Sequence, residues 1–144
     1  MEIRKMKPSD ENEVLAMMRP FYSSPAVFTN GSEAIFRRDF AECISDSPFL
    51  EGFILEDGSI ILGYAMLAHS FSTEFGKSCV WIEDIYLKPE ARGKGFAPKF
   101  LSFVREAYPQ AVLRLEVEAE NTRAVSAYRK SGFDTLPYLE MLNN

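Results

Sequence analysis

The segment from Glu90 to Ala97 carries two closely spaced glycines, Gly93 and Gly95, ahead of a stretch with helical periodicity. Glycine lets a backbone approach a ligand closely, and the free amides at the start of a helix suit an anionic group such as a pyrophosphate. A single Gly-x-Gly pair is also typical of an ordinary turn between a strand and a helix. Both interpretations stand at this point. A dinucleotide-binding loop fits less well, because the segment follows an antiparallel meander. It also lacks the third glycine, three residues after the second, that such loops carry.

Four other side chains could do chemistry. Tyr128 lies in a short helical stretch with small or apolar neighbours one turn earlier, where a packed core tyrosine is the ordinary interpretation. Glu83 and Asp84 are adjacent on a β-like stretch that leads to the glycine loop, and they could act on protons or simply satisfy neighbouring amides. Glu116 lies on the acidic face of another alternating stretch.

The elements that position these residues follow from periodicity and turn signals. The first half of the chain predicts a strand, two helices and then an antiparallel meander. These elements are a strand at Glu2–Met6, a helix from the N-cap Ser9 to Pro20, a helix from Ser32 to Asp46, and strands at Gly52–Glu56, Ile60–Ser70 and Ser78–Leu87.

The second half predicts a helix at Phe96–Ala107, a strand at Ala111–Ala119, a helix at Asn121–Lys130 ended by Gly132, and a β-like tail at Tyr138–Leu142. Strands that are first antiparallel and then joined through a helix imply a mixed sheet with helices on its faces. The fold class is therefore α/β.

Length and composition exclude several classes of protein. A chain of 144 residues with 47% hydrophobic content is expected to fold as one domain over residues 1–144. A formal net charge of −5 argues against a nucleic-acid partner, and no apolar run approaches membrane-spanning length. Cys43 and Cys79 have no metal-binding spacing, so we expect two free thiols, no metal site and a cytoplasmic protein.

The glycine loop resembles the coenzyme A loop of the GNAT acetyltransferase family. That pattern is Gln or Arg, two residues, Gly, one residue, then Gly or Ala, and Arg92, Gly95 and Ala97 match it in order. The segment from Asn121 to Phe133 is similar to the family signature N-x-x-A-x-x-x-Y-x-x-x-G-F. The resemblance implies a GNAT fold, with six or seven mostly antiparallel strands splayed at a parallel pair and flanked by about four helices. It also implies a homodimer.

The resemblance assigns roles to residues at matching positions and implies acetyl-coenzyme A (acetyl-CoA) as cosubstrate. Tyr128 looks like the general acid that meets the departing thiolate, and Asn121 is expected to contact the cofactor. The backbone of three residues at the end of the strand Ser78–Leu87 is expected to pair with the pantetheine arm, and the glycine loop is expected to hold the pyrophosphate. The residues expected to pair with the pantetheine arm are Ile85, Tyr86 and Leu87. The loop residues expected at the pyrophosphate are Arg92, Gly93, Lys94, Gly95, Phe96 and Ala97.

The acceptor amine must lose a proton before it can attack a thioester. An amine with a pKa of about 10.4 costs roughly 4.6 kcal/mol to deprotonate at pH 7. Glu83 is our candidate base, acting directly or through a water, and Glu116 is the alternative. The run from Trp81 to Leu87 resembles the corresponding strand of diamine and polyamine acetyltransferases. We therefore expect a small amine acceptor, with a protein amine or a noncatalytic acyl-CoA sensor as alternatives.

Overall fold

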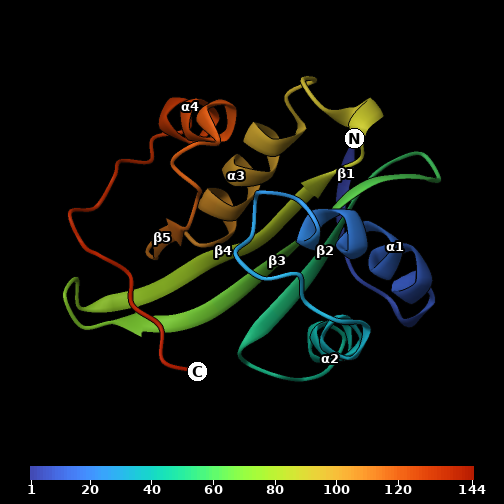
Figure 1. The fold of residues 1–144 in the computed structure, drawn as a ribbon, viewed down its shortest axis with the longest axis horizontal. Helices are drawn as coiled ribbons and strands as arrows, with labels where there is room; N and C mark the ends of the chain where they lie inside the picture. Colours follow the sequence, from blue (N-terminus) through green and yellow to red (C-terminus); the bar gives the residue numbers. More distant parts are fainter.

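The computed structural model describes residues 1–144 and contains one five-stranded mixed sheet whose strands lie side by side in chain order (Figure 1). Its strands are β1 (Glu2–Lys5), β2 (Leu50–Asp57), β3 (Ile60–Ser72), β4 (Lys77–Leu87) and β5 (Val112–Leu115). The first three pairings are antiparallel, whereas β4 and β5 run parallel. The mixed sheet and its parallel pair are confirmed, but the strands number five and not six or seven.

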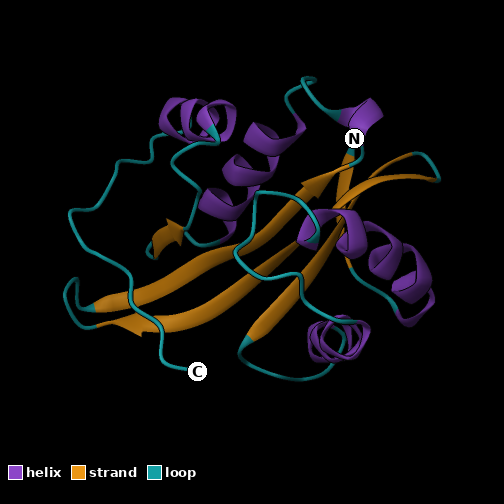
Figure 2. Cartoon of the chain, viewed as in Figure 1, coloured by secondary structure: helices purple, strands orange, loops and turns teal.

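Four α-helices flank the sheet (Figure 2). They are α1 (Glu11–Tyr22), α2 (Glu33–Cys43), α3 (Phe96–Ala107) and α4 (Thr122–Lys130), with short 3-10 turns at Pro8–Asp10 and Pro89–Ala91. The sheet separates two apolar cores. Side chains of α1 and α2 pack on one face around Tyr64 and Met66. Those of α3 pack on the other face around Phe53 and Leu67. We refer to these as the α1/α2 face and the α3 face.

The first helix differs from the prediction at both ends. Ser9 is not its N-cap, because the chain first makes a 3-10 turn over Pro8–Asp10 and the α-helix begins at Glu11. Pro20 lies inside the helix, which continues to Tyr22. The aromatic residues that follow the proline pack against the α1/α2 core, and this tertiary packing outweighs the local tendency of proline to end a helix.

The C-terminal part has less regular structure than predicted. The strand expected over residues 111–119 pairs with β4 only from Val112 to Leu115. The strand expected at Tyr138–Leu142 is absent, and the chain beyond α4 passes across the β3–β4 end of the sheet as an irregular tail (Figure 1). Pro137 has no amide to donate to a ladder, and Leu139 is 92% exposed. The tail therefore reaches the sheet without joining it.

Candidate functional site

The C-terminal end of β4 has an open edge. Pairing with β5 stops at Ile82, although β4 continues to Leu87. The amide of Lys88 donates to the carbonyl of Leu62 on the β3 side (2.9 Å). Because successive amides of a strand alternate in direction, the amides of Leu87 and Ile85 face away from β3, into the opening left by β5. This edge is available to pair with an extended ligand.

A β-bulge at this opening sets the direction of two carboxylates. The register between β4 and β3 passes directly from Ile82 to Asp84, which leaves Glu83 as an extra residue. Ile82 and Ile85 both pack on the α3 face. Since a bulge places two consecutive side chains on one side of a strand, Glu83 and Asp84 both project toward the α1/α2 face. The bulge therefore delivers a pair of acidic side chains to one side of the opening.

Asp84 is a buried carboxylate held by two phenols. It accepts hydrogen bonds from the hydroxyl of Tyr64 (2.8 Å) and from that of Tyr22 (3.0 Å). Burial raises the pKa of Asp84 to about 6, even though the two phenol hydrogen bonds lower it. Asp84 is thus held by two side-chain hydroxyls, whereas the structural alternative from the sequence had neighbouring amides as its partners.

We expect Asp84→Asn to flatten the pH dependence of the free energy of unfolding. A carboxyl whose pKa rises on folding, here from 3.8 to about 6, destabilises the fold as the pH increases across that window. At about 1.36 kcal/mol per unit, the loss is on the order of 3 kcal/mol at neutral pH. Asparagine keeps the shape and an acceptor oxygen. Urea denaturation at pH 4 and pH 7 measures the difference, and equal pH dependence of the two proteins would contradict the assignment.

Three carboxylates gather on the α1/α2 face beside the opening. They belong to Glu83, Glu116 and Glu140, and the last of these comes from the C-terminal tail. Partial desolvation raises the pKa of Glu83, and the charge of Glu140 raises it further. Desolvation and a hydrogen bond with Glu140 raise the pKa of Glu116 to about 7. A hydrogen bond from the Tyr138 hydroxyl to Glu74 (3.0 Å) holds the tail nearby. The sequence reasoning missed Glu140 because it placed this segment in a strand.

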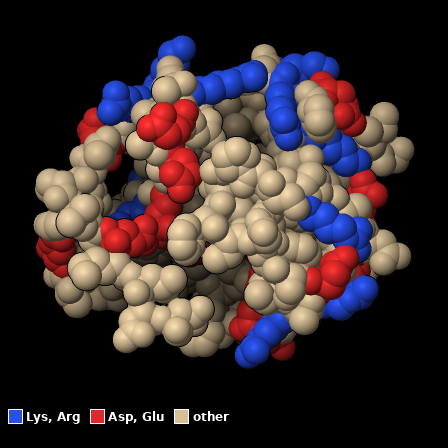
Figure 3. All heavy atoms as spheres, in the orientation of Figure 1, with Lys and Arg blue, Asp and Glu red and all other residues tan.

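The charges of the two sides of the opening differ. Figure 3 shows Lys and Arg side chains along the edge where Figure 1 places α4 and the loop before α3, and acidic side chains gathered below that edge, beside β5. A basic edge attracts phosphates, and an acidic side attracts ammonium groups. The opening therefore lies between surfaces suited to an anionic and a cationic reactant.

The loop before α3 presents a row of free amides. Gly93 has a φ of 73°, and Gly95, the N-cap of α3, has a φ of 79°, a left-handed backbone that glycine adopts without strain. The amides of residues 93–97 donate to no acceptor within the chain. Together with the positive end of the helix dipole, they suit an anion. The residues present therefore fit a pyrophosphate.

Arg92, at the basic position of the loop motif, turns its side chain toward β4. Its Nε donates to the carbonyl of Leu87 (2.9 Å), and its guanidinium lies over the ring of Tyr86, 5.5 Å from the centroid. These contacts tie the start of the loop to the end of β4. The Nε of Arg92 thus braces the loop against β4, and the predicted contact of this side chain with a cofactor stays a prediction.

Helix α4 carries the two remaining predicted residues. The side chain of Asn121 caps the helix, because its Oδ1 accepts from the amide of Ala124 (3.3 Å). The ring of Tyr128 packs edge-to-face on Phe133, with centroids 6.2 Å apart. Burial raises the pKa of Tyr128, so the phenol stays protonated. Every fully buried side-chain polar atom has a hydrogen-bond partner. The Tyr128 hydroxyl has none within the chain, so it is not fully buried and remains available to a ligand.

The structure places these residues on two sides of the opening. Ile85, Leu87 and Tyr128 pack against the same apolar cluster on the α3 face. Glu83 projects to the α1/α2 face, with the other carboxylates. The phenol of Tyr128 can therefore reach a ligand bound along the β4 edge from the α3 face. A second reactant that must lose a proton can approach the same ligand from the α1/α2 face, where Glu83 lies.

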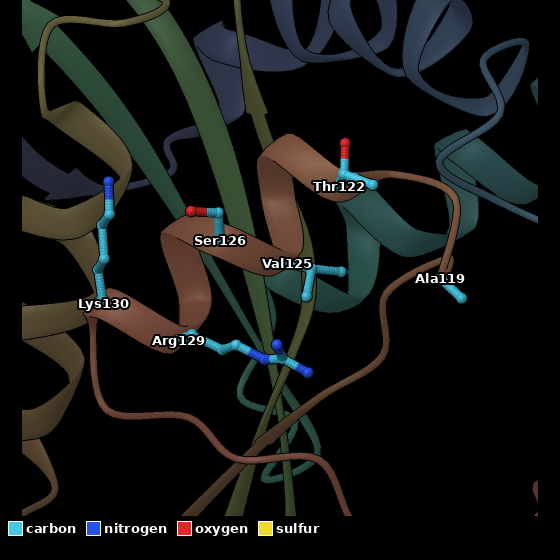
Figure 4. Close-up of a pocket in the computed structure, with 6 residues that line it drawn as sticks. All are labelled: Ala119, Thr122, Val125, Ser126, Arg129 and Lys130. Atoms are coloured by element: carbon cyan, nitrogen blue, oxygen red, sulfur yellow. The ribbon is translucent and has the colours of Figure 1, made fainter.

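A surface cavity lies on α4 apart from these residues. It measures about 480 Å³. Its lining residues are Ala119, Thr122, Val125, Ser126, Arg129 and Lys130 (Figure 4). Tyr128 is not among these lining residues, although Val125 precedes it by one helical turn. None of the predicted catalytic or cofactor residues lines this cavity.

Comparison with known sequences gives a consistent family. The sequence model of the acetyltransferase (GNAT) family matches residues 13–133. The thialysine N-epsilon-acetyltransferase of Bos taurus is 30% identical over 151 aligned residues, which cover 96% of this chain and 86% of that protein. The likeness therefore extends well beyond the loop and α4.

Solved acetyltransferase structures share the fold. A possible acetyltransferase from Clostridium difficile 630 superposes with a TM-score of 0.85 at 16% identity, over 99% of this chain and 96% of the other. The enzyme AAC(6')-Iy, in complex with the bisubstrate analog CoA-S-monomethyl-acetylneamine, superposes with a TM-score of 0.80 at 16% identity, over 99% and 97%. At these identities the likeness concerns the fold.

Proposed function

This chain belongs to the GNAT family of acetyltransferases, and we propose that it transfers an acetyl group from acetyl-CoA to the primary amine of a small cationic acceptor. The unpaired amides of residues 93–97, next to the open edge of β4, carry the proposal. They form the one part of the structure where a backbone free of partners coincides with a family motif for coenzyme A.

The donor side uses main-chain groups. The amides of residues 93–97 would hold the pyrophosphate, and the outward amides of Ile85 and Leu87 would pair with the pantetheine arm. Asn121 keeps its side-chain amide nitrogen, Nδ2, free to donate while its Oδ1 caps α4. Tyr128 would donate a hydrogen bond to the thioester sulfur as it leaves. Because burial raises its pKa, stabilisation by hydrogen bonding precedes any full proton transfer.

The acceptor side is acidic. Glu83, Glu116 and Glu140 would attract an ammonium group to the α1/α2 face of the opening. The relatives named thialysine N-epsilon-acetyltransferases support an amine on a small molecule. We rank a diamine or polyamine first, an amino-acid amine such as that of thialysine second, and a protein amine third.

Glu83 is the proposed proton acceptor. The bulge places it at the point where β5 leaves β4, so it lies closest along the strand to the edge that would hold the thioester. A raised pKa makes its carboxylate a better base than an ordinary glutamate. Glu116 is the alternative, and its pKa of about 7 leaves it partly protonated at neutral pH.

A turnover screen tests the proposed function. The protein is incubated with acetyl-CoA and, separately, spermidine, putrescine, thialysine, lysine and a lysine-containing peptide, and the released coenzyme A thiol is measured. We expect release with at least one small amine, and the highest kcat/KM with a diamine or polyamine.

Two other outcomes would contradict parts of the proposal. Modification of the peptide alone would assign a protein acceptor. Saturable binding of acetyl-CoA with no transfer to any amine would identify a sensor that uses the GNAT fold without catalysis.

A further inference from the structure

A guanidinium from α4 lies directly against the glycine loop. A Cβ placed on Gly93 would be 3.2 Å from Nη2 of Arg123. Arg123 belongs to the first turn of α4, two residues after the capping Asn121. Helix α4 thus brings a positive charge to the loop whose amides have no partners.

Arg123 has no partner within the chain, and the same holds for Lys94 of the loop itself. Arg123 forms no ion pair, and its guanidinium makes no hydrogen bond to the rest of the chain. The residue is exposed, so the guanidinium is accessible to a ligand. By contrast, Arg92 donates to Leu87, Lys99 donates to the carbonyl of Met1 (3.0 Å), and Lys88 pairs with Glu13 (2.5 Å). Of the two arginines beside the loop, Arg123 is the one whose guanidinium makes no hydrogen bond within the chain.

We propose that Arg123 binds the pyrophosphate of acetyl-CoA, as a charged clamp over the amides of residues 93–97. The inference rests on the proposed function, which assigns the pyrophosphate to this loop. The amides supply neutral donors, whereas a guanidinium supplies charge and a planar pair of donors that matches two phosphate oxygens. Arg123 of α4 would thereby add a second arginine to the phosphate site, beside Arg92, whose Nε braces β4.

Cofactor truncation and substitution test the clamp together. Dissociation constants are measured by calorimetry for acetyl-CoA, for its 3′-dephospho form and for S-acetyl-pantetheine, which lacks the pyrophosphate. We expect Arg123→Gln to weaken binding of the first two about tenfold, the size of a lost charged hydrogen bond at an exposed site, and to leave the third unchanged. Arg123→Lys should recover part of the loss, because it keeps the charge without the planar pair of donors.

The matched control is Arg129→Gln, on the same helix but away from the loop, which should bind all three compounds like the wild type. An unchanged Kd of Arg123→Gln for acetyl-CoA would overturn the inference. A loss confined to acetyl-CoA and absent from the dephospho form would also overturn it, because the contact would then be with the 3′-phosphate. Failure of the wild type to bind acetyl-CoA would instead contradict the proposed function.

Discussion

Tyr128→Phe is expected to lower kcat about a hundredfold, the typical effect of removing one positioned acid or donor, while the Kd for acetyl-CoA stays within about twofold. The substitution removes only the hydroxyl. The ring keeps its edge-to-face contact with Phe133, and no buried polar group loses a partner. The measurement is steady-state kinetics with the best amine of the screen, combined with calorimetric binding of acetyl-CoA.

The matched control is Tyr108→Phe at the end of α3. The hydroxyl of Tyr108 bonds to Glu51, so its loss should reduce stability and leave kcat unchanged. This is the reverse of the pattern expected for Tyr128. An unchanged kcat in Tyr128→Phe would show that this tyrosine is a packed core residue and that another group assists the leaving thiolate.

Glu83→Gln is expected to lower kcat/KM for the amine about a hundredfold at pH 7, the lower end of what a general base contributes. The raised pKa of Glu83 fixes the sign of the pH effect. Wild-type activity should rise with pH as this carboxyl loses its proton, at a pH above the usual range of glutamate. In Glu83→Gln that limb disappears, and the deficit shrinks at higher pH because more of the amine is already neutral.

Glu116→Gln is the control for Glu83→Gln, since both carboxylates lie on the same face and interact with Glu140. We expect it to lose less than about tenfold in kcat/KM, mainly through weaker attraction of the ammonium group. A larger loss in Glu116→Gln than in Glu83→Gln would assign the base to Glu116. Small losses of kcat/KM in both variants would indicate that water accepts the proton of the amine.

Much of the fold could be predicted because local signals agreed with tertiary structure. The second helix starts at Ser32 as predicted, and the hydroxyl of Ser32 caps α2 by accepting from the amide of Ile35. Helix α3 has the predicted bounds, because its apolar face and the preceding glycine point to the same start. The tail differs because alternating residues predict a strand only where a partner strand exists, and Tyr138 finds none.

The site was only partly predictable, for a related reason. The free amides around Gly93 and Gly95 follow from glycine and helix position, which are local properties. The bulge at Glu83 is a property of register between two strands, and no signal in one strand alone reveals it. The same holds for Arg123, whose role depends on where α4 meets the loop.

The central claim is that the unpaired amides of residues 93–97 receive the phosphates of acetyl-CoA. Selective ¹⁵N labelling of the eight glycines and titration with acetyl-CoA tests it most directly by NMR. We predict that the amide resonances of Gly93 and Gly95 shift downfield on saturation with acetyl-CoA and stay in place with S-acetyl-pantetheine. Glycine resonances that do not move at saturating acetyl-CoA would contradict the account.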